Sequence, residues 1–119
     1  MAGYVDLYIL PVPKKHIPFY RRLSQKMGRV MRGHGCLEYR EFLGHDLHVK
    51  NMVSPLTTVK MKRGEVLVFA VTGFHSKSHR DQVLKRTMND PRVKKMCENK
   101  MPFDHKRMVY GGFSTIVKA

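Results

Sequence analysis

The chain has 119 residues, with 23 lysine and arginine residues against 9 aspartate and glutamate residues, so its formal net charge is +14 at pH 7. This length is typical of one domain, which we place at residues 1–119, and it suffices to bury about two-thirds of the unfolded surface. The longest near-continuous apolar run, Val66 to Val71, is too short to cross a membrane, and no signal-peptide pattern is present. Two cysteines, Cys36 and Cys97, are too few for a disulfide framework. We therefore expect a cytoplasmic protein with free thiols and no membrane insertion.

The first two predicted elements differ in their hydrophobic period. Residues 4–12 are typical of a strand that carries Val5, Leu7 and Ile9 on one face and Tyr4, Asp6, Tyr8 and Leu10 on the other. Residues 17–33 follow the period of a helix, which the Gly33-His34-Gly35 triplet ends. The apolar face of this helix carries Ile17, Tyr20, Leu23, Met27, Val30, Met31 and His34, and the opposite face carries Arg21, Arg22, Arg29 and Arg32.

The remaining elements follow at regular intervals. A charged second strand is predicted at 37–43, then a polar loop at 44–56, a short extended piece at 57–61 and a third strand at 65–73. Ser76 is a predicted N-cap of a helix that runs to about residue 88, with Val83, Leu84, Thr87 and Met88 inward. Asp90 and Pro91 open a short helix to about residue 99, with Val93, Met96 and Cys97 inward, and a last strand is predicted at 106–117.

This order of elements predicts an α+β fold of the ferredoxin-like βαββαβ type with an antiparallel sheet. In that topology the first and third strands are central, and the helices cover only one face of the sheet. A wet second face would require the third strand to alternate apolar and polar residues, but residues 66–71 are apolar on both faces. We therefore expect a homodimer in which two sheets cover one another as a dimeric α/β barrel.

Several segments also carry a family resemblance. They are YVD at 4–6 leading to PVPK at 11–14, HG-x-LEY at 34–39, S-x-x-HRD at 76–81, DPR at 90–92 and, most specifically, MPFDHKRMVYGGF at 101–113. In this order they resemble the YbaA-like family of small bacterial proteins. The resemblance implies the dimeric α/β-barrel fold. It implies no catalytic residues, because the family has no assigned activity.

Asp6 is the most unusual residue of the first strand, because it is a carboxylate in a predicted central strand, between Tyr4 and Tyr8. We expect its face to point into the dimer barrel, where a buried carboxylate must be paired or hydrogen-bonded. It is then either a ligand-orienting group or general base in a cavity, or a structural partner of a tyrosine or of an arginine such as Arg107. The candidate ligand-binding residues are Tyr4, Asp6, Tyr8, His79, Arg107 and Tyr110.

Two further clusters have residue types that carry chemistry. Ser76, His79 and Asp81 contain the residues of a hydrolase triad, but they lie on one short helical segment without a nucleophile elbow, so capping by Ser76 is the preferred interpretation. His79 and Arg80 at that helix N-terminus are an alternative anion site. His45, Asp46 and His48 are metal-binding types in a loop, without a full ligand set. We predict no metal and no cofactor.

The strong positive charge supports a second functional hypothesis. The leading one is a homodimer that binds a small molecule in a barrel cavity or at the dimer seam, with or without catalysis. The alternative is sequence-independent binding of nucleic acid or another polyanion by the outer helices. A structural or partner-binding dimer is the third. The candidate polyanion-binding residues are Arg21, Arg22, Arg29, Arg32, Lys85, Arg86, Lys94 and Lys95.

Overall fold

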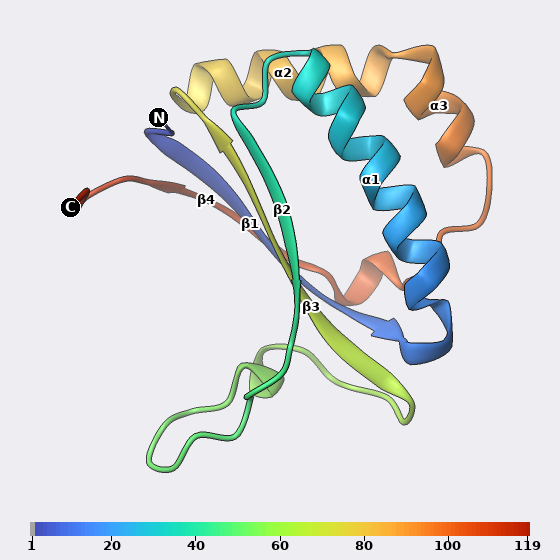
Figure 1. Ribbon diagram of the computed structural model, residues 1–119, viewed down its shortest axis with the longest axis vertical. Helices are drawn as coiled ribbons and strands as arrows, with labels where there is room; N and C mark the ends of the chain where they lie inside the picture. The colour runs from blue at the N-terminus through green and yellow to red at the C-terminus, as the bar shows by residue number, and fades with distance from the viewer. Residues whose placement is uncertain (1) are drawn as a thin grey trace.

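The computed structural model describes residues 2–119 as a four-stranded antiparallel sheet with helices on one face (Figure 1). The strand order is β2 (Glu38–Leu43), β3 (Glu65–Phe74), β1 (Tyr4–Pro13) and β4 (Val109–Ser114), so the first and third strands are central, as the ferredoxin-like topology predicts. None of the helices in residues 2–119 is long and apolar enough to cross a membrane. The elements are β1 (Tyr4–Pro13), η1 (Lys14–His16), α1 (Ile17–Gly33), β2 (Glu38–Leu43), η2 (Pro55–Thr58), β3 (Glu65–Phe74), α2 (Lys77–Asn89), α3 (Pro91–Cys97), η3 (His105–Arg107) and β4 (Val109–Ser114).

Local signals in the sequence set the helix ends. Gly35, which follows α1, has a φ of 113°, a conformation that favours glycine over any residue with a side chain. The Ser76 side chain accepts a hydrogen bond from the backbone N–H of His79 at the start of α2. The Asp90 side chain accepts one from the N–H of Arg92, with Pro91 in the first turn of α3. The predicted caps are therefore confirmed.

The covered face of the sheet carries the core. Leu10 and Val12 of β1 pack with Tyr20 of α1 and Val68 of β3. A second cluster joins the sheet to α1 and α2 near the other end of the strands, and it consists of Met31, Cys36, Phe74 and Val83. Because alternate residues of a strand share a face, Tyr4, Asp6 and Tyr8 lie on the same covered face as Leu10. The expectation that Asp6 points into a dimer barrel is wrong, since both faces of β1 are rich in apolar residues and alternation alone did not distinguish them.

The opposite face of the sheet is apolar and has no helix over it (Figure 1). The strand pairings bring side chains of all four strands together there. Phe69 is 36% exposed and Phe113 is 53% exposed. We call this surface the open sheet face, and it consists of Val5, Leu7, Ile9, Phe42, Phe69, Val71, Val109 and Phe113.

Four local predictions differ from the structure. Residues 57–61 form no strand, because Pro55–Thr58 is a 3₁₀ turn capped by Ser54. The last strand is shorter than expected, at Val109–Ser114, since His105–Arg107 is another 3₁₀ turn, capped by Asp104. Cys97 was expected inward but is exposed, because α3 ends at that residue. Met88 was also expected inward but is exposed in the last turn of α2, where Val83 and Thr87 are the buried residues.

Candidate functional site: a groove between α1 and β2

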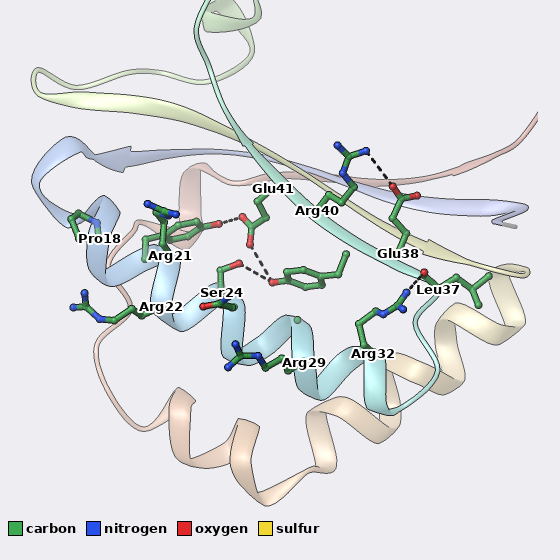
Figure 2. A pocket seen from close by; sticks show the side chains of 14 residues that line it. Pro18, Arg21, Arg22, Ser24, Arg29, Arg32, Leu37, Glu38, Arg40 and Glu41 are labelled. Atoms are coloured by element: carbon green, nitrogen blue, oxygen red, sulfur yellow. Dashed lines mark hydrogen bonds and ion pairs between the residues drawn. The ribbon is translucent and has the colours of Figure 1, made fainter.

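A concave surface lies between helix α1 and the edge strand β2 (Figure 2). It is an open groove of about 1030 Å³, with Gly28 on the helix side and Tyr39 on the strand side. Gly28 allows the close approach of the two elements, since a Cβ at this position would lie 2.7 Å from Cδ1 of the Tyr39 ring. The absence of a side chain at residue 28 therefore lets α1 and β2 lie close together along the groove.

A carboxylate held by two phenols forms the inner wall of the groove. Glu41 accepts a hydrogen bond from the Tyr20 hydroxyl at Oε1 and one of 3.2 Å from the Tyr39 hydroxyl at Oε2. The Tyr39 hydroxyl also lies 3.0 Å from Oγ of Ser24 on α1. Figure 2 shows this chain of contacts crossing from the helix to the strand. It fixes the orientation of the Glu41 carboxylate relative to α1.

Burial dominates the electrostatics of Glu41. Removal from water raises the pKa of the Glu41 carboxyl, and the hydrogen bonds from Tyr20 and Tyr39 counteract part of the rise. Burial likewise raises the pKa of both phenols, and the nearby Glu41 charge adds to that effect. In residues 2–119, Glu41 has no ion-pair partner. The groove therefore contains a carboxylate whose proton affinity is raised and whose charge no cation neutralises.

Guanidinium groups of α1 line the rest of the groove. Arg32 donates a hydrogen bond to the backbone carbonyl of Leu37, and Arg22 lies 6.0 Å from the Phe19 ring. The helix itself contains no acidic residue. Within residues 2–119, none of the four helix arginines that line the groove forms an ion pair with an acid; these are Arg21, Arg22, Arg29 and Arg32.

Four of the six predicted ligand-binding residues come together elsewhere, between β1, β4 and α2. Asp6 is fully buried and accepts hydrogen bonds from Arg80, at 2.7 Å, and from the Tyr110 hydroxyl, at 3.0 Å. Tyr8 stacks on Tyr110 with 4.9 Å between ring centroids, and Tyr4 lies 5.2 Å from the Arg80 guanidinium carbon. Burial raises the pKa of Asp6, while Tyr110 and Arg80 act in the opposite direction. Asp6 thus has the structural partners considered from the sequence, with Arg80 in the place suggested for Arg107.

The other two predicted residues lie apart from this cluster. His79 Nδ1 accepts a hydrogen bond from the backbone N–H of His75 at 3.0 Å. Arg107 forms a bidentate ion pair with Glu65, at 2.6 and 2.7 Å, and contacts Asp104 at 3.0 Å. The placement of Arg107 beside Asp6 is therefore wrong, because the 3₁₀ turn before β4 directs it to the start of β3.

The remaining clusters also have structural roles. The Ser76 hydroxyl is used in capping, and Asp81 pairs with Lys77 at 3.0 Å and with Arg80 at 2.8 Å, so no triad is assembled. No group of three or more His, Cys, Asp or Glu side chains within residues 2–119 is arranged to hold a metal ion. Cys36 is a buried thiol that donates to the carbonyl of Glu38.

The predicted polyanion-binding residues are all exposed on the helical layer. Arg86 uses part of its guanidinium to donate to the carbonyl of His34 at 3.1 Å. The four arginines of α1 line the groove, and the others lie on α2 and α3; these are Lys85, Arg86, Lys94 and Lys95.

Sequence reasoning missed the acidic wall of the groove. Glu41 was treated as one of the charges of an edge strand, and Tyr20 as a core residue. The signal that was present is the pairing of Tyr39 with Glu41 on one face of β2, opposite a helix residue with a hydroxyl, Ser24. Recognising it required the distance between α1 and β2, which no local pattern gives.

The sheet order and its one-sided helical layer define a ferredoxin-like α+β protein, here with an arginine-lined groove. The chain belongs to the family described as protein of unknown function (DUF1428), whose model matches residues 3–105. It is 34% identical over 114 residues to the uncharacterized protein YbaA of Escherichia coli K12, which covers 96% of this chain and 97% of that protein. The resemblance read from the sequence motifs is thereby confirmed.

Solved structures with low sequence identity share the fold. Rv0793 from Mycobacterium tuberculosis has a TM-score of 0.58 at 12% identity, with 98% of this chain and 97% of that chain covered. A dimeric ferredoxin-like protein from an uncultured marine organism has a TM-score of 0.51 at 7% identity, with 100% and 92% covered. At these identities the likeness establishes the fold alone.

Proposed function

We propose that this protein is a homodimer that binds a small organic anion in the groove between α1 and β2. One observation carries the proposal: the four α1 arginines that line this open groove have no acidic partner in residues 2–119, and they lie along the same groove as a carboxylate that has no cationic partner there. Arginine presents a planar fork of donors that matches carboxylate and phosphate groups, and pairing with one such group would satisfy several guanidinium donors at once. The ligand class is therefore a carboxylate or a phosphate ester of metabolite size.

Calorimetric titration tests the ligand class. The unmodified protein should bind at least one of a panel of mono- and dicarboxylates and sugar phosphates, and Arg21→Gln and Arg32→Gln should each weaken that binding about tenfold, since charge-assisted hydrogen bonds contribute about 1.5–3 kcal/mol. Arg63→Gln is the matched control, because Arg63 is exposed in the turn before β3 and lies outside the groove. Equal losses in all three variants would contradict the groove.

The alternative ligand of the same arginines is a polyanion such as nucleic acid. Duplex DNA would bind with an affinity that falls steeply with salt, by about 10³-fold or more between 50 and 200 mM if six or more phosphates are contacted. Small anions at the groove lose much less over the same range. Binding of DNA with that slope, together with no binding of any panel compound, would replace the proposal with the polyanion hypothesis.

The open sheet face supports the dimeric state. Contiguous apolar patches of this kind on a soluble protein mark an interaction surface, and the marine structural neighbour is itself described as dimeric. A second copy is the natural occupant, since the face spans all four strands and a two-fold contact would cover both copies at once. The helical layers and their grooves would then face away from the seam.

Light scattering at micromolar concentration tests the dimer. The unmodified chain should have twice its 13.9 kDa mass, and Phe69→Glu should give the monomer, because two carboxylates would be buried at the seam. Phe19→Glu should leave the dimer intact, since Phe19 is similarly exposed, at 46%, but belongs to α1. A monomeric unmodified chain would refute the dimer without affecting the groove.

A further inference from the structure

The Glu41 carboxylate has free acceptor capacity toward the groove. A carboxylate offers about four lone-pair positions on two oxygens, and in residues 2–119 Glu41 accepts two hydrogen bonds, one at each oxygen. The Tyr20 and Tyr39 hydroxyls that make them are on opposite walls, so the carboxylate is held from both sides. Because Glu41 lines the groove, the remaining lone pairs of its carboxylate can accept a hydrogen bond or a proton from a bound ligand.

A carboxylate with free acceptor positions is not needed merely to connect α1 to β2. Other low-exposure carboxylates of this protein have an arginine partner: Arg107 pairs with Glu65, and Arg80 pairs with Asp6. Glu41 instead has two neutral donors, while the four α1 guanidiniums along the same groove have no acidic partner in residues 2–119. Neutral donors orient a carboxylate and leave more of its basicity than a bound cation would.

We propose that Glu41 is a proton-transfer catalyst that interconverts the keto and enol forms of a 2-oxo carboxylic acid bound in the groove. This inference rests on the proposed function, because the α1 arginines must hold the carboxylate of that acid. A 2-oxo acid is favoured because its C2 carbonyl is bonded both to the carboxylate that the arginines hold and to C3, whose hydrogens this carbonyl makes acidic. Its enolate is a second anion for a neighbouring guanidinium to stabilise.

The step balances without a co-reactant. Glu41 accepts the proton from C3 of the substrate, and the C–H electron pair forms the C2–C3 double bond. The carbonyl π pair moves to the C2 oxygen, which becomes an enolate paired with a guanidinium of α1. Return of the proton from Glu41 to the enolate oxygen gives the enol, and return to C3 gives the keto form.

Exchange of C3 protons with solvent deuterium measures this step directly. We would follow the C3 methylene signal of 2-oxobutyrate, and of phenylpyruvate as a second probe, by proton NMR in D₂O. The unmodified protein should accelerate exchange, and Glu41→Gln should lower the catalysed rate by at least about 100-fold, since a positioned base contributes about 10²–10⁴-fold. The Gln variant should bind each probe within about threefold of the unmodified affinity.

Glu98→Gln is the control, because Glu98 is exposed at the end of α3 and lies outside the groove. It should leave exchange unchanged. Glu41→Asp keeps a carboxylate but withdraws it by one methylene, so it should fold and give intermediate exchange, which covers the case in which Glu41→Gln does not fold.

The outcomes separate this inference from the function on which it rests. A probe that saturates the groove without faster exchange, or exchange that is equal in the Glu41 and Glu98 variants, would overturn proton transfer and leave anion binding standing. Failure of both probes to bind, in a protein that binds a sugar phosphate, would overturn the 2-oxo acid and the proton transfer only. Failure of every anion to bind would overturn both.

Discussion

Gly28 of α1 lies directly against the ring of Tyr39 in β2, so that a Cβ at residue 28 would be 2.7 Å from Cδ1 and 2.9 Å from Cε1 of that ring. Alanine normally favours a helix over glycine by about 1 kcal/mol. Here the steric cost outweighs that gain, because Tyr39 is held by Ser24 and Glu41 and its strand is paired to β3. We predict that Gly28→Ala lowers the free energy of unfolding by about 1–3 kcal/mol in urea titrations.

Gly33 at the end of α1 is the control for this substitution. A Cβ there would meet no atom within 4 Å, and the residue belongs to the same helix. Gly33→Ala should therefore be neutral or stabilise the protein by up to about 1 kcal/mol. If both alanine variants behaved alike, the contact between Gly28 and Tyr39 would not determine the spacing of α1 and β2.

The buried ion pair between Asp6 and Arg80 is predicted to be a major determinant of stability. Arg80 is 11% exposed and Asp6 is fully buried, so Arg80→Met leaves an uncompensated carboxylate in the core. The expected loss is about 3 kcal/mol at pH 7, a size typical of breaking a buried pair from one side. The double variant Asp6→Asn, Arg80→Met should recover part of that loss, because no buried charge remains.

The pH dependence of the Arg80→Met variant follows from Asp6. Burial already raises the pKa of Asp6 in the native state, and removal of Arg80 raises it further. The folded protein then binds a proton that the unfolded chain, with a pKa near 3.9, releases, so stability falls as pH rises from about 4 through the folded pKa. The loss relative to the unmodified protein should be smaller at pH 4 than at pH 7; a loss that grows toward acid would show that Asp6 is not the titrating group.

Asp90 should confer stability with the opposite pH dependence. Its carboxylate accepts hydrogen bonds from Arg92 and from His34, at 2.8 Å in each case, and these contacts lower the pKa of Asp90. Because the folded pKa is below the unfolded value near 3.9, the stabilisation is present above that value and lost as pH falls through the folded pKa. Asp90→Asn, which keeps an N-cap residue, should shift the urea midpoint downward at pH 7 and by a smaller amount at pH 2.5. Asp46→Asn, in a loop and outside any ion pair of residues 2–119, should shift neither midpoint.

The fold could be predicted because its signals are local. The helical period of residues 17–33 predicted α1, and the caps at Ser76 and Asp90 predicted where two further helices begin. The unbroken apolar run of β3 identified it as a central strand. Errors arose where a turn had no such signal: Ser54-Pro55 opens a 3₁₀ turn in place of a strand, and Asp104 caps another before β4.

The sites were predicted only in part, because they depend on which faces meet. Tyr4, Asp6 and Tyr8 were grouped correctly by strand alternation, and Tyr110 joins them through its pairing with Tyr8. Their face was misassigned, since β1 is apolar on both sides and only the packing of Leu10 on Tyr20 decides which side the helices cover. The groove depends on the distance between α1 and an edge strand, and its key carboxylate, Glu41, has the same sequence context as any exposed edge charge.

Gly112 in β4 provides a last test, this time of the Asp6 cluster. A Cβ at this residue would overlap the hydroxyl of Tyr4 and lie 2.7 Å from its ring carbon Cζ. Tyr4 would have to move, and its ring would leave the Arg80 guanidinium, which now lies 5.2 Å from the ring centroid. Gly112→Ala should therefore lower the free energy of unfolding by about 1–3 kcal/mol. Gly111→Ala is the adjacent control, because a Cβ there would lie at an ordinary 3.5 Å from its nearest neighbour, Phe113 Cε1, on the open sheet face. Equal losses of unfolding free energy in the two variants would mean that β4 tolerates no side chain at either glycine, irrespective of Tyr4.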